Sequence, residues 1–595
     1  MQRTLISNLK ELIEKQVLLK GSIHNMRDLG KIMFLILKDR SGLVQIVVEA
    51  QELISDMRKL QPGSILKVEG KVSATNSTEL GVEIHEPRIE LLQAVTQQWP
   101  LDLTKKEISA NLETLLDHRP ISLRHQRSQA IFKIQARMVQ AYRDFLIKEG
   151  FVEFFGPNII GASSEGGTEL FKVDYFDNDA MLSQSAQLYK QMMVGVYERV
   201  FALMKCFRAE NSNTRRHLTE ATQFEFEMGY IEDFSEIMDM LENIIKYIVE
   251  VINSECQQEL NILGVKLALA PKDVAFPRIN FHDALELVFK RTGIDERGEM
   301  DLSPLAEAEL CKYAREEHGT DFIFVPHFLR KKTAFYAKPN EQNPEVTNYF
   351  DLLCREIEIA SGGQRINDHD ELVESLKLKG LDPEHFTDYL SIFKYGMPKH
   401  GGFGMGMERL TMMLLGLENI RESTLFPSDP KRIAGVKISG KTFFGEALFP
   451  EIIRRLRKNN IEFKHLEHEA ASTSEESAAV RGTSLEQGVK ALILRSKKTG
   501  KNYMVCVRAD QKIDLKLIEG IVADKLEFES ANGIKDRYGL ELGAIPPFGN
   551  LLGLNVYIAK NILEQDEIAF NAGTKSDSII MKAKDLVRMT QADLI

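Results

Sequence analysis

The segment Gly404-Met405-Gly406-Met407-Glu408-Arg409 places an arginine directly after a glycine-rich run. Two other segments have a similar composition, Phe207-Arg208-Ala209-Glu210 and Ser361-Gly362-Gly363-Gln364-Arg365. Small residues let a ligand approach the backbone closely, and a guanidinium group can hold a phosphate or a carboxylate through two parallel hydrogen bonds. No Walker-type loop opens a helix after a strand. The sequence therefore predicts an anion site assembled from distant segments.

Composition narrows the class of protein. The 595 residues exceed one ordinary hydrophobic core, since domains commonly contain roughly 150 residues. The 76 Lys and Arg against 87 Asp and Glu give a net charge of -11, which excludes a global basic field, so any nucleic acid must be bound locally. No apolar run reaches the roughly 18 residues that span a bilayer, and five scattered cysteines signal no disulfide framework. We expect a cytoplasmic chain with no membrane contact.

The first hundred residues have the pattern of a small β-barrel. Short β-prone runs separated by polar breaks cover residues 17–22, 32–38, 43–48, 64–72 and 81–92. Several short strands in residues 1–100 favour a closed sheet. Residues 101–127 show little periodicity, and we expect a linker there.

A large α+β domain is expected over residues 128–434. Apolar residues from Ile131 to Phe145 recur at three- and four-residue steps, which predicts a helix that ends at Gly150. Residues 151–160 are apolar with an internal proline, which is typical of an edge strand. Strand and helix patterns then alternate irregularly, which favours an antiparallel sheet.

Residues 435–595 form a further α/β unit of ordinary domain size. Its pattern predicts an amphipathic helix at 446–458 and strands at 491–495 and 503–507.

Three segments follow the order of the class II aminoacyl-tRNA synthetase motifs. Residues 151–157 resemble the first motif, 207–227 the second and 404–410 the third. Between them, Gln184-Ser185-Ala186-Gln187-Leu188-Tyr189-Lys190-Gln191 and the segment from Glu358 to Arg365 are similar to the archaeal and eukaryotic type of aspartyl-tRNA synthetase. The resemblance implies an N-terminal anticodon-binding OB-fold, a class II catalytic domain with an antiparallel sheet, and a homodimer.

This resemblance implies an ATP-dependent ligase that joins L-aspartate to tRNA(Asp) through an aspartyl adenylate. The α-carboxylate is already ionised, so the step needs positive charge around the phosphates rather than a general base. Arg208 would hold the α-phosphate and Arg409 the terminal phosphates, and both are expected to be catalytic. The remaining members of the expected ATP pocket are Glu210, Arg216, His217, Leu218, Glu358, Gly406, Met407 and Glu408.

The metal and amino-acid sites are implied in the same way. Mg²⁺ prefers oxygen ligands, which Asp351, Glu358 and Ser361 would supply. The expected aspartate pocket comprises Glu165, Gln187, Lys190, Arg208, Ser361 and Arg365. A side-chain carboxylate in a closed pocket needs compensation of its charge, and Lys190 with Arg365 would provide it.

The barrel is expected to read the anticodon. Single-stranded bases are recognised by stacking on aromatic rings and by hydrogen bonds to their edges. Phe34, Gln45 and Glu83 offer this chemistry. The sequence leaves open whether tRNA(Asn) is charged as well.

The C-terminal unit resembles the small YbaK-like, or prolyl-tRNA-editing, deacylases. The matching segments include Arg481-Gly482-Thr483-Ser484-Leu485-Glu486-Gln487-Gly488-Val489-Lys490, Gly543-Ala544-Ile545-Pro546-Pro547 and Asn571-Ala572-Gly573. Ester hydrolysis needs a placed water and donors for the oxyanion. By this resemblance Lys490 and Gly543 are the expected catalytic residues of a domain that hydrolyses mischarged aminoacyl-tRNA.

Two alternatives remain at this stage. One is an asparagine-tRNA ligase, and Lys190 argues against it because the related asparaginyl enzymes lack a lysine at this point. The other is a tRNA-binding synthetase paralogue without aminoacylation, and the presence of all three motif arginines argues against it.

Overall fold

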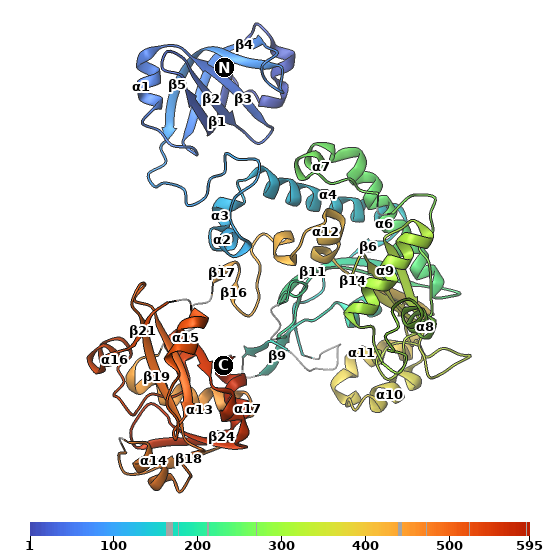
Figure 1. Ribbon diagram of the computed structural model, residues 1–595. Coiled ribbons are helices and arrows are strands. Elements are labelled where there is room, and N and C mark those ends of the chain that lie inside the picture. The colour runs from blue at the N-terminus through green and yellow to red at the C-terminus, as the bar shows by residue number, and fades with distance from the viewer. Residues whose placement is uncertain are drawn as a thin grey trace. The chain divides into compact units, whose positions relative to one another are not determined.

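The computed structural model describes residues 1–161, 170–176, 178–210, 214–268, 270–437, 443–471, 473–522, 524–590 and 592–595. The chain divides into two compact units, Met1–Lys437 and Ile438–Ile595 (Figure 1). Among the described residues no helix is long and apolar enough to cross a membrane.

The N-terminal residues form a closed five-stranded barrel, as the sequence predicts. Its strand order is β1-β2-β3-β5-β4. Side chains alternate along β2, where Met33, Leu35 and Leu37 are buried inside the barrel. The elements are η1 (Ile6–Leu12), β1 (Gln16–Asp28), β2 (Met33–Lys38), β3 (Leu43–Val48), α1 (Gln51–Met57), β4 (Ile65–Ala74) and β5 (Val82–Gln93).

The segment that follows the barrel differs from the expected linker because it contains two short helices, α2 (Leu112–Asp117) and α3 (Arg119–Ser122). The buried guanidinium of Arg432 holds α2, with Nη2 lying 2.7 Å from Glu113 Oε2 and 2.6 Å from Asp117 Oδ1. Helices this short are not stable alone. The contact with Arg432, which is distant in the sequence, stabilises α2. The local sequence periodicity therefore does not predict this helix.

A seven-stranded sheet forms the centre of the unit, with strand order β12-β13-β14-β15-β11-β10-β6. Neighbouring strands are antiparallel except β6, which pairs in parallel with β10 at the edge. The predicted antiparallel sheet is therefore confirmed. The edge strand expected over residues 151–160 is much shorter than predicted, since β6 covers only Val152–Glu153 and Ile159–Ile160 pairs in a separate sheet. The strands are β6 (Val152–Glu153), β10 (Arg199–Phe207), β11 (Glu220–Gly229), β12 (Phe322–Pro326), β13 (Tyr349–Cys354), β14 (Ile357–Gln364) and β15 (His400–Gly406).

The two faces of β11 differ in chemistry, and this difference positions the site. Phe224 and Phe226 lie in the hydrophobic core beneath α4 (Gln126–Lys148) and α6 (Ser235–Glu255). Residues two apart along a strand share a face, so Gln223, Glu225 and Glu227 lie on the opposite face. Helix α4 covers the periodic run from Ile131 to Phe145 and ends just before Gly150, as the sequence predicts.

The remaining elements of this unit surround the sheet. They are β7 (Ile159–Ile160), β8 (Lys172–Tyr175), β9 (Asn178–Leu182), α5 (Gln187–Tyr197), α7 (Gln257–Leu263), α8 (Phe281–Thr292), α9 (Pro304–His318), α10 (His369–Leu378), η2 (Pro383–Phe386), α11 (Thr387–Ser391), η3 (Ile392–Tyr395), α12 (Met407–Leu415), η4 (Ile420–Ser423), β16 (Arg432–Ile433) and β17 (Val436–Lys437).

The C-terminal unit has mixed sheets and helices, as the sequence predicts. A five-stranded sheet has the order β21-β19-β20-β22-β25, and a three-stranded sheet has the order β18-β24-β23. The elements are η5 (Gly445–Ala447), α13 (Leu448–Lys458), β18 (Phe463–Glu467), α14 (Ser474–Arg481), β19 (Val489–Ser496), β20 (Asn502–Arg508), α15 (Leu515–Val522), β21 (Leu526–Phe528), α16 (Ala531–Tyr538), η6 (Gly549–Leu552), β22 (Asn555–Ile558), η7 (Lys560–Glu564), β23 (Glu567–Asn571), β24 (Asp577–Lys582), α17 (Ala583–Thr590) and β25 (Asp593–Leu594).

Candidate functional site

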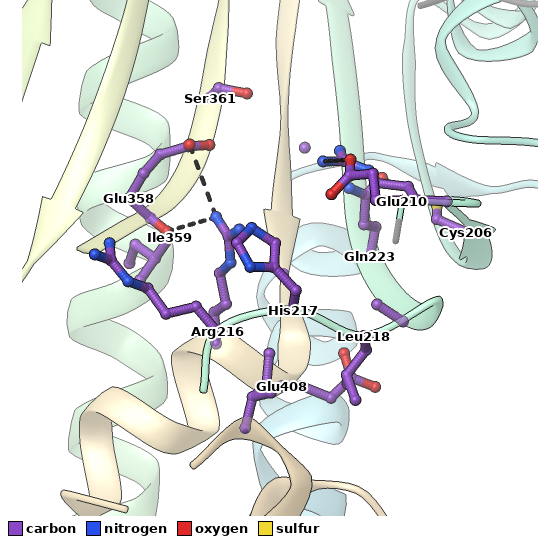
Figure 2. A pocket seen from close by; sticks show the side chains of 16 residues that line it. Cys206, Glu210, Arg216, His217, Leu218, Gln223, Glu358, Ile359, Ser361 and Glu408 are labelled. Atoms are coloured by element: carbon purple, nitrogen blue, oxygen red, sulfur yellow. Dashed lines mark hydrogen bonds and ion pairs between the residues drawn. The ribbon is translucent and has the colours of Figure 1, made fainter. Parts of the chain in front are cut away.

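A pocket of about 710 Å³ opens on the polar face of the central sheet (Figure 2). It brings together Arg208 and Arg216, which follow β10, and Arg409, which lies about two hundred residues further along the chain on α12. Of the residues that the sequence assigns to the sites, ten line this pocket: Arg208, Glu210, Arg216, His217, Leu218, Glu358, Ser361, Gly406, Glu408 and Arg409. Glu165 lies outside the described residues.

Acidic side chains hold the cations of this pocket in place. Arg409 Nη1 donates to the carbonyl oxygen of Glu358 at 2.9 Å and lies 3.7 Å from its Oε2, and both interactions are drawn as dashed lines in Figure 2. Arg216 Nη1 lies 2.7 Å from Glu307 Oε2. Three arginines and the acids around them thus make a polar pocket in which the guanidinium groups are oriented before a ligand arrives.

The surroundings of His217 disfavour its protonated form. Its Nδ1 lies 2.6 Å from Thr214 Oγ1. Burial, followed by the positive charge of Arg409, lowers the pKa of His217. A neutral imidazole can donate one hydrogen bond and accept another, which suits recognition of an uncharged polar group.

Glu408 has a structural partner within the pocket. Its carboxylate accepts hydrogen bonds from the backbone N–H of Thr222, at 2.9 and 3.1 Å. Burial raises the pKa of Glu408. This contact fixes the first turn of α12, and with it Arg409, against strand β11. Met407 packs against the hydrophobic core and does not line the pocket.

A buried cluster of four charges lies on the same sheet face. Lys190 Nζ donates to Glu225 Oε2 at 2.8 Å and lies 3.3 Å from Glu227 Oε2. Arg365 Nε donates to Glu227 Oε1 at 2.9 Å. Burial alone would raise the pKa of Glu227, but Arg365 and Lys190 hold it below its usual value. The two expected aspartate-binding cations therefore meet, and two carboxylates within the protein already compensate their charge.

A hydrogen-bonded chain of side chains lies beside this cluster, next to the backbone hydrogen bond from Arg365 N–H to the carbonyl oxygen of His400. Gln187 Nε2 donates to Gln191 Oε1 at 2.9 Å, and Tyr389 OH donates to the same oxygen. Gln191 Nε2 lies 2.9 Å from His400 Nε2, and burial lowers the pKa of His400. This chain orients Gln187, which is itself buried.

The glycine-rich run is strand β15, and its glycines make room for the acids of β11. A Cβ on Gly402 would lie 2.2 Å from Glu227 Oε2 and 2.0 Å from the carbonyl oxygen of Phe226. A Cβ on Gly404, which lines the pocket, would lie 3.4 Å from Glu225 Oε2. The pocket and the charged cluster are therefore neighbours along β11 and β15.

Sequence reasoning missed Glu225, Glu227, Gln191 and His400. A signal was present for the two acids, because Gln223-Phe224-Glu225-Phe226-Glu227 alternates polar and aromatic residues with the period of a strand. Acids repeated on one face of a strand that is buried on both faces require cationic partners.

Glu358 and Ser361 line the pocket, whereas Asp351 does not line it and lies on the neighbouring strand. Asp351 on β13 is paired in register with Ser361 on β14. Burial raises the pKa of Asp351 far above its usual value, and the nearby charge of Glu358 raises it further. A buried carboxylate beside a second acid and a hydroxyl is a donor set that fits a hard divalent cation such as Mg²⁺.

Three residues expected to contact bases belong to the barrel. Phe34 is half-buried on the outer face of β2, and Gln45 is half-buried on the outer face of the adjacent strand β3. Gln45 Nε2 donates to Glu83 Oε2 at 2.9 Å. The barrel thus presents an aromatic ring and a linked amide and carboxylate on its outer surface.

The C-terminal unit has a pocket of its own, with a volume of about 540 Å³. Both expected residues, Lys490 and Gly543, line it together with Arg481 and Asn571. Lys490 Nζ donates to the carbonyl oxygen of Ala509 at 3.2 Å. Asn571 Nδ2 donates to the carbonyl oxygen of Gly543, and Arg481 Nη2 donates to Asn571 Oδ1.

Comparison with known families gives three matches along the chain. Residues 17–92 match the OB-fold nucleic acid binding domain, 111–430 match the tRNA synthetases class II (D, K and N), and 468–589 match the aminoacyl-tRNA editing domain.

Curated relatives match most of the chain and nearly all of their own length. The aspartate–tRNA(Asp/Asn) ligase of Thermus thermophilus is 41% identical over 431 residues, which cover 72% of this chain and 99% of that protein. The aspartate–tRNA(Asp) ligase of Pyrococcus abyssi is 42% identical over 429 residues, which cover 71% of this chain and 97% of that protein.

Solved structures of aminoacyl-tRNA synthetases also match most of the chain. The asparaginyl-tRNA synthetase of Pyrococcus horikoshii complexed with asparaginyl-adenylate has a TM-score of 0.68 at 33% identity, covering 73% of this chain and 99% of that one. The aspartyl tRNA synthetase of Entamoeba histolytica has a TM-score of 0.65 at 29% identity, covering 73% of this chain and 93% of that one. The chain belongs to the class II tRNA synthetases of the D, K and N group, and it carries an N-terminal OB-fold domain and a C-terminal aminoacyl-tRNA editing domain.

Proposed function

We propose that this chain joins L-aspartate to tRNA(Asp) at the expense of ATP, and that its C-terminal unit hydrolyses mischarged aminoacyl-tRNA. The observation that carries the ligase is the convergence of Arg208, Arg216 and Arg409 in one pocket, beside the buried cluster of Lys190 and Arg365. Triphosphate and amino acid can then be held side by side on one face of one sheet.

Charge neutralisation is the chemistry that this pocket offers. In adenylate formation the α-carboxylate of aspartate attacks the α-phosphorus of ATP, and the bond to pyrophosphate breaks. Arg208 holds the α-phosphate and Arg409 holds the terminal phosphates, so that both oppose the negative charge that gathers in the transition state. Arg216, Glu210 and His217 complete the nucleotide pocket, while Glu408 keeps Arg409 in position through Thr222.

Asp351 and Glu358 would hold Mg²⁺, with the hydroxyl of Ser361 beside them. When bound, the ion supplies additional positive charge to the phosphates. Its binding would also relieve the repulsion between the two carboxylates.

The charge of the Lys190 cluster does not by itself explain the choice of amino acid. The cluster carries no net formal charge, because the two cations Lys190 and Arg365 are matched by Glu225 and Glu227. Lys190 and Arg365 are therefore not uncompensated cations that await a substrate carboxylate. Preference for aspartate is supported instead by the relatives, since those from Thermus and Pyrococcus abyssi are both named as aspartate ligases. The asparaginyl enzyme of Pyrococcus horikoshii keeps asparagine as the alternative substrate.

The tRNA is bound at the barrel, where Phe34 stacks on an anticodon base and Gln45 and Glu83 contact base edges. The relatives include enzymes named for tRNA(Asp) alone and for tRNA(Asp/Asn). tRNA(Asn) is therefore the second candidate acceptor.

A homodimer is part of the proposal. Strand β6 lies at the sheet edge, and near it Phe155 is 85% exposed and Ile147 is 60% exposed. Large apolar side chains beside an open strand edge are the features that a second copy would cover.

In the C-terminal unit, Lys490 and the loop at Gly543 would hold the ester and stabilise its oxyanion. A water oxygen would bond to the ester carbonyl carbon, and the bond to the ribose oxygen would break as that oxygen takes a proton. Gly543 has a φ of +86°, a left-handed conformation that glycine adopts without strain.

The test is ATP–pyrophosphate exchange with the full chain, run with aspartate and with asparagine, followed by charging of purified tRNA(Asp) and tRNA(Asn). We expect exchange with aspartate, and loss of at least about a hundredfold in Arg208→Gln. Arg297→Gln is the matched control, because Arg297 is exposed, pairs with Asp295 and Glu286, and does not line the ligase pocket. Exchange with asparagine alone would establish the alternative ligase, and exchange with neither would leave a tRNA-binding paralogue.

A further inference from the structure

The pocket of the C-terminal unit is lined by two cations and by no acid among the described residues. Arg481, at the end of α14, and Lys490, on β19, face it, and its other walls are small or uncharged, including Gly488, Ala491 and Asn571. The ligase pocket differs, since its three arginines are matched by Glu210, Glu358 and Glu408.

The hydrogen bonds that Arg481 makes to the described residues go to neutral groups. Its Nε donates to Ser578 Oγ at 2.7 Å, and its Nη2 donates to Asn571 Oδ1. Within the described part of the chain no carboxylate forms an ion pair with Arg481 or Lys490. The charge of Lys490 contributes to lowering the pKa of Asp510, but the carboxylate of Asp510 is paired with Arg508 at 2.8 Å. Burial lowers the pKa of Arg481 to about 10, so the group remains charged at neutral pH without a counter-ion.

Arg481 is half-buried, and a partly desolvated cation without a counter-ion is costly unless a ligand supplies the charge. The two neutral contacts also fix the guanidinium plane, because Ser578 Oγ donates to Asn571 Oδ1 at 3.0 Å and His468 Nε2 lies 2.7 Å from Ser578 Oγ. The arginine is thus oriented as a rigid fork, which is the geometry that binds carboxylates and phosphates.

We propose that Arg481 forms an anion subsite of the editing pocket, and that the anion is the side-chain carboxylate of an aspartyl ester. The inference rests on the proposed hydrolysis and names its substrate class. It makes the editing unit a check on the same amino acid that the ligase unit attaches, so that aspartate on a wrong tRNA is removed. The other source of the same anionic chemistry is the phosphate of the tRNA acceptor end.

The test compares the full chain with Arg481→Gln and Arg481→Lys. Gln keeps a hydrogen-bond donor for Asn571 and loses the charge, whereas Lys keeps the charge. Deacylation is measured on the same tRNA carrying aspartate, the isosteric neutral asparagine, or alanine. We expect the wild type to prefer the aspartyl ester by about tenfold or more, Arg481→Gln to abolish that preference, and Arg481→Lys to retain part of it.

Two results separate the sources of the anion. If Arg481→Gln raises the KM of all three esters equally, the subsite stands and its anion is the phosphate. The anion subsite is wrong if Arg481→Gln deacylates all three esters at the wild-type rate. It is also wrong if Arg481→Lys loses as much deacylation activity as Arg481→Gln while its unfolding temperature is unchanged. Arg454→Gln is the matched control, because Arg454 is exposed and pairs with Glu451 outside the pocket.

A binding measurement separates this inference from the proposed hydrolysis. The probe is 3′-aspartylamino-3′-deoxyadenosine, a non-hydrolysable amide that lacks phosphate, with its asparaginyl analogue as the neutral reference. Aspartyl-specific binding that disappears in Arg481→Gln would support a carboxylate subsite even if no ester were cleaved. If the esters are cleaved but the wild type and Arg481→Gln bind the probe equally well, the proposed hydrolysis is supported and the carboxylate subsite is wrong.

Discussion

Lys190 and Arg365 bind the same carboxylate, that of Glu227, at 3.3 and 2.9 Å from its two oxygens. They come from α5 and from the end of β14, and all three side chains are buried. Glu225 is the second carboxylate that binds Lys190, so two cations and two carboxylates share the cluster. The first consequence of this arrangement concerns stability, because removing one partner of a buried ion pair leaves the other charge unpaired.

Lys190→Met should destabilise the ligase unit by about 3–5 kcal/mol, the usual cost of breaking a buried pair from one side. Two buried carboxylates would then share Arg365 alone. Denaturant unfolding of the full chain, followed on the ligase transition, measures the loss. The matched control is Lys205→Met, because Lys205 is 46% exposed and its pair with Glu220 should contribute at most about 1 kcal/mol. Equal losses of stability in the two variants would contradict a special contribution of the buried cluster to the stability of the ligase unit.

Acid should weaken the same cluster. The pKa of Glu227 is lowered in the folded protein relative to its ordinary value of 4.5, because Arg365 and Lys190 outweigh burial. A depressed carboxyl pKa contributes stability above the unfolded value, and this contribution is lost as the pH falls through the folded value. The ligase transition should therefore lose stability as the pH falls below about 4.5.

The comparison that isolates Glu227 is Glu227→Gln, which cannot titrate. Its stability should change less steeply with pH over the acidic range than that of the wild type, although its starting stability is lower. Identical slopes would show that other carboxylates carry the acid sensitivity.

The sequence predicts the elements of the fold well where the pattern is local. The barrel strands, helix α4, the edge strand β6 and the strands of the C-terminal unit follow from hydrophobic periodicity and from turn residues. Helix α2 does not, since Arg432, more than three hundred residues away in the chain, stabilises it.

The candidate site divides in the same way. Arg208, Arg216 and Arg409 could be predicted because motif order places them together. The internal pairing of Lys190 and Arg365 could not, because it depends on Glu225 and Glu227 facing them across a sheet register that no local pattern specifies. The role of Glu408 was hidden for a similar reason, since its partner is a backbone N–H.

Two glycines of β15 should respond differently to the same substitution. Gly402→Ala puts a Cβ within 2.2 Å of Glu227 Oε2 and 2.0 Å of a backbone oxygen, so the strand has to shift. We expect a loss of stability of about 1–3 kcal/mol, typical of overpacking.

Gly404→Ala is the partner experiment. Its Cβ would lie 3.4 Å from Glu225 Oε2, an ordinary contact, but it would enter the ligase pocket. Stability should be nearly unchanged while the KM for ATP or aspartate rises. The reverse order of stability losses would contradict the packing described for β15.

Glu408→Ala tests whether this acid binds ATP or supports the pocket. Its carboxylate accepts the Thr222 N–H, so Ala leaves a half-buried donor without its partner at a cost of about 1–3 kcal/mol. We expect lower stability and a reduced kcat, because α12 carries Arg409, with little change in the KM for ATP. Glu408→Gln retains an acceptor oxygen and should recover most of both losses. A large rise in the KM for ATP in the Gln variant would instead assign the charge of Glu408 to the nucleotide.

Asn571 connects Arg481 to the loop of Gly543 and should control hydrolysis without touching ligation. Its amide nitrogen donates to the Gly543 carbonyl while its oxygen accepts from Arg481 and Ser578. Asn571→Ala frees the loop and removes one of the two groups that orient the guanidinium. We expect deacylation to fall by about tenfold to a hundredfold, in line with the loss of one preorganised contact at an active site, while ATP–pyrophosphate exchange is unchanged.

Asn550→Ala is a suitable control, because Asn550 bonds the carbonyl oxygen of Met589 and does not line the pocket. Asn571 has no positioning role if hydrolysis in Asn571→Ala matches that of the wild type while its unfolding temperature is also unchanged.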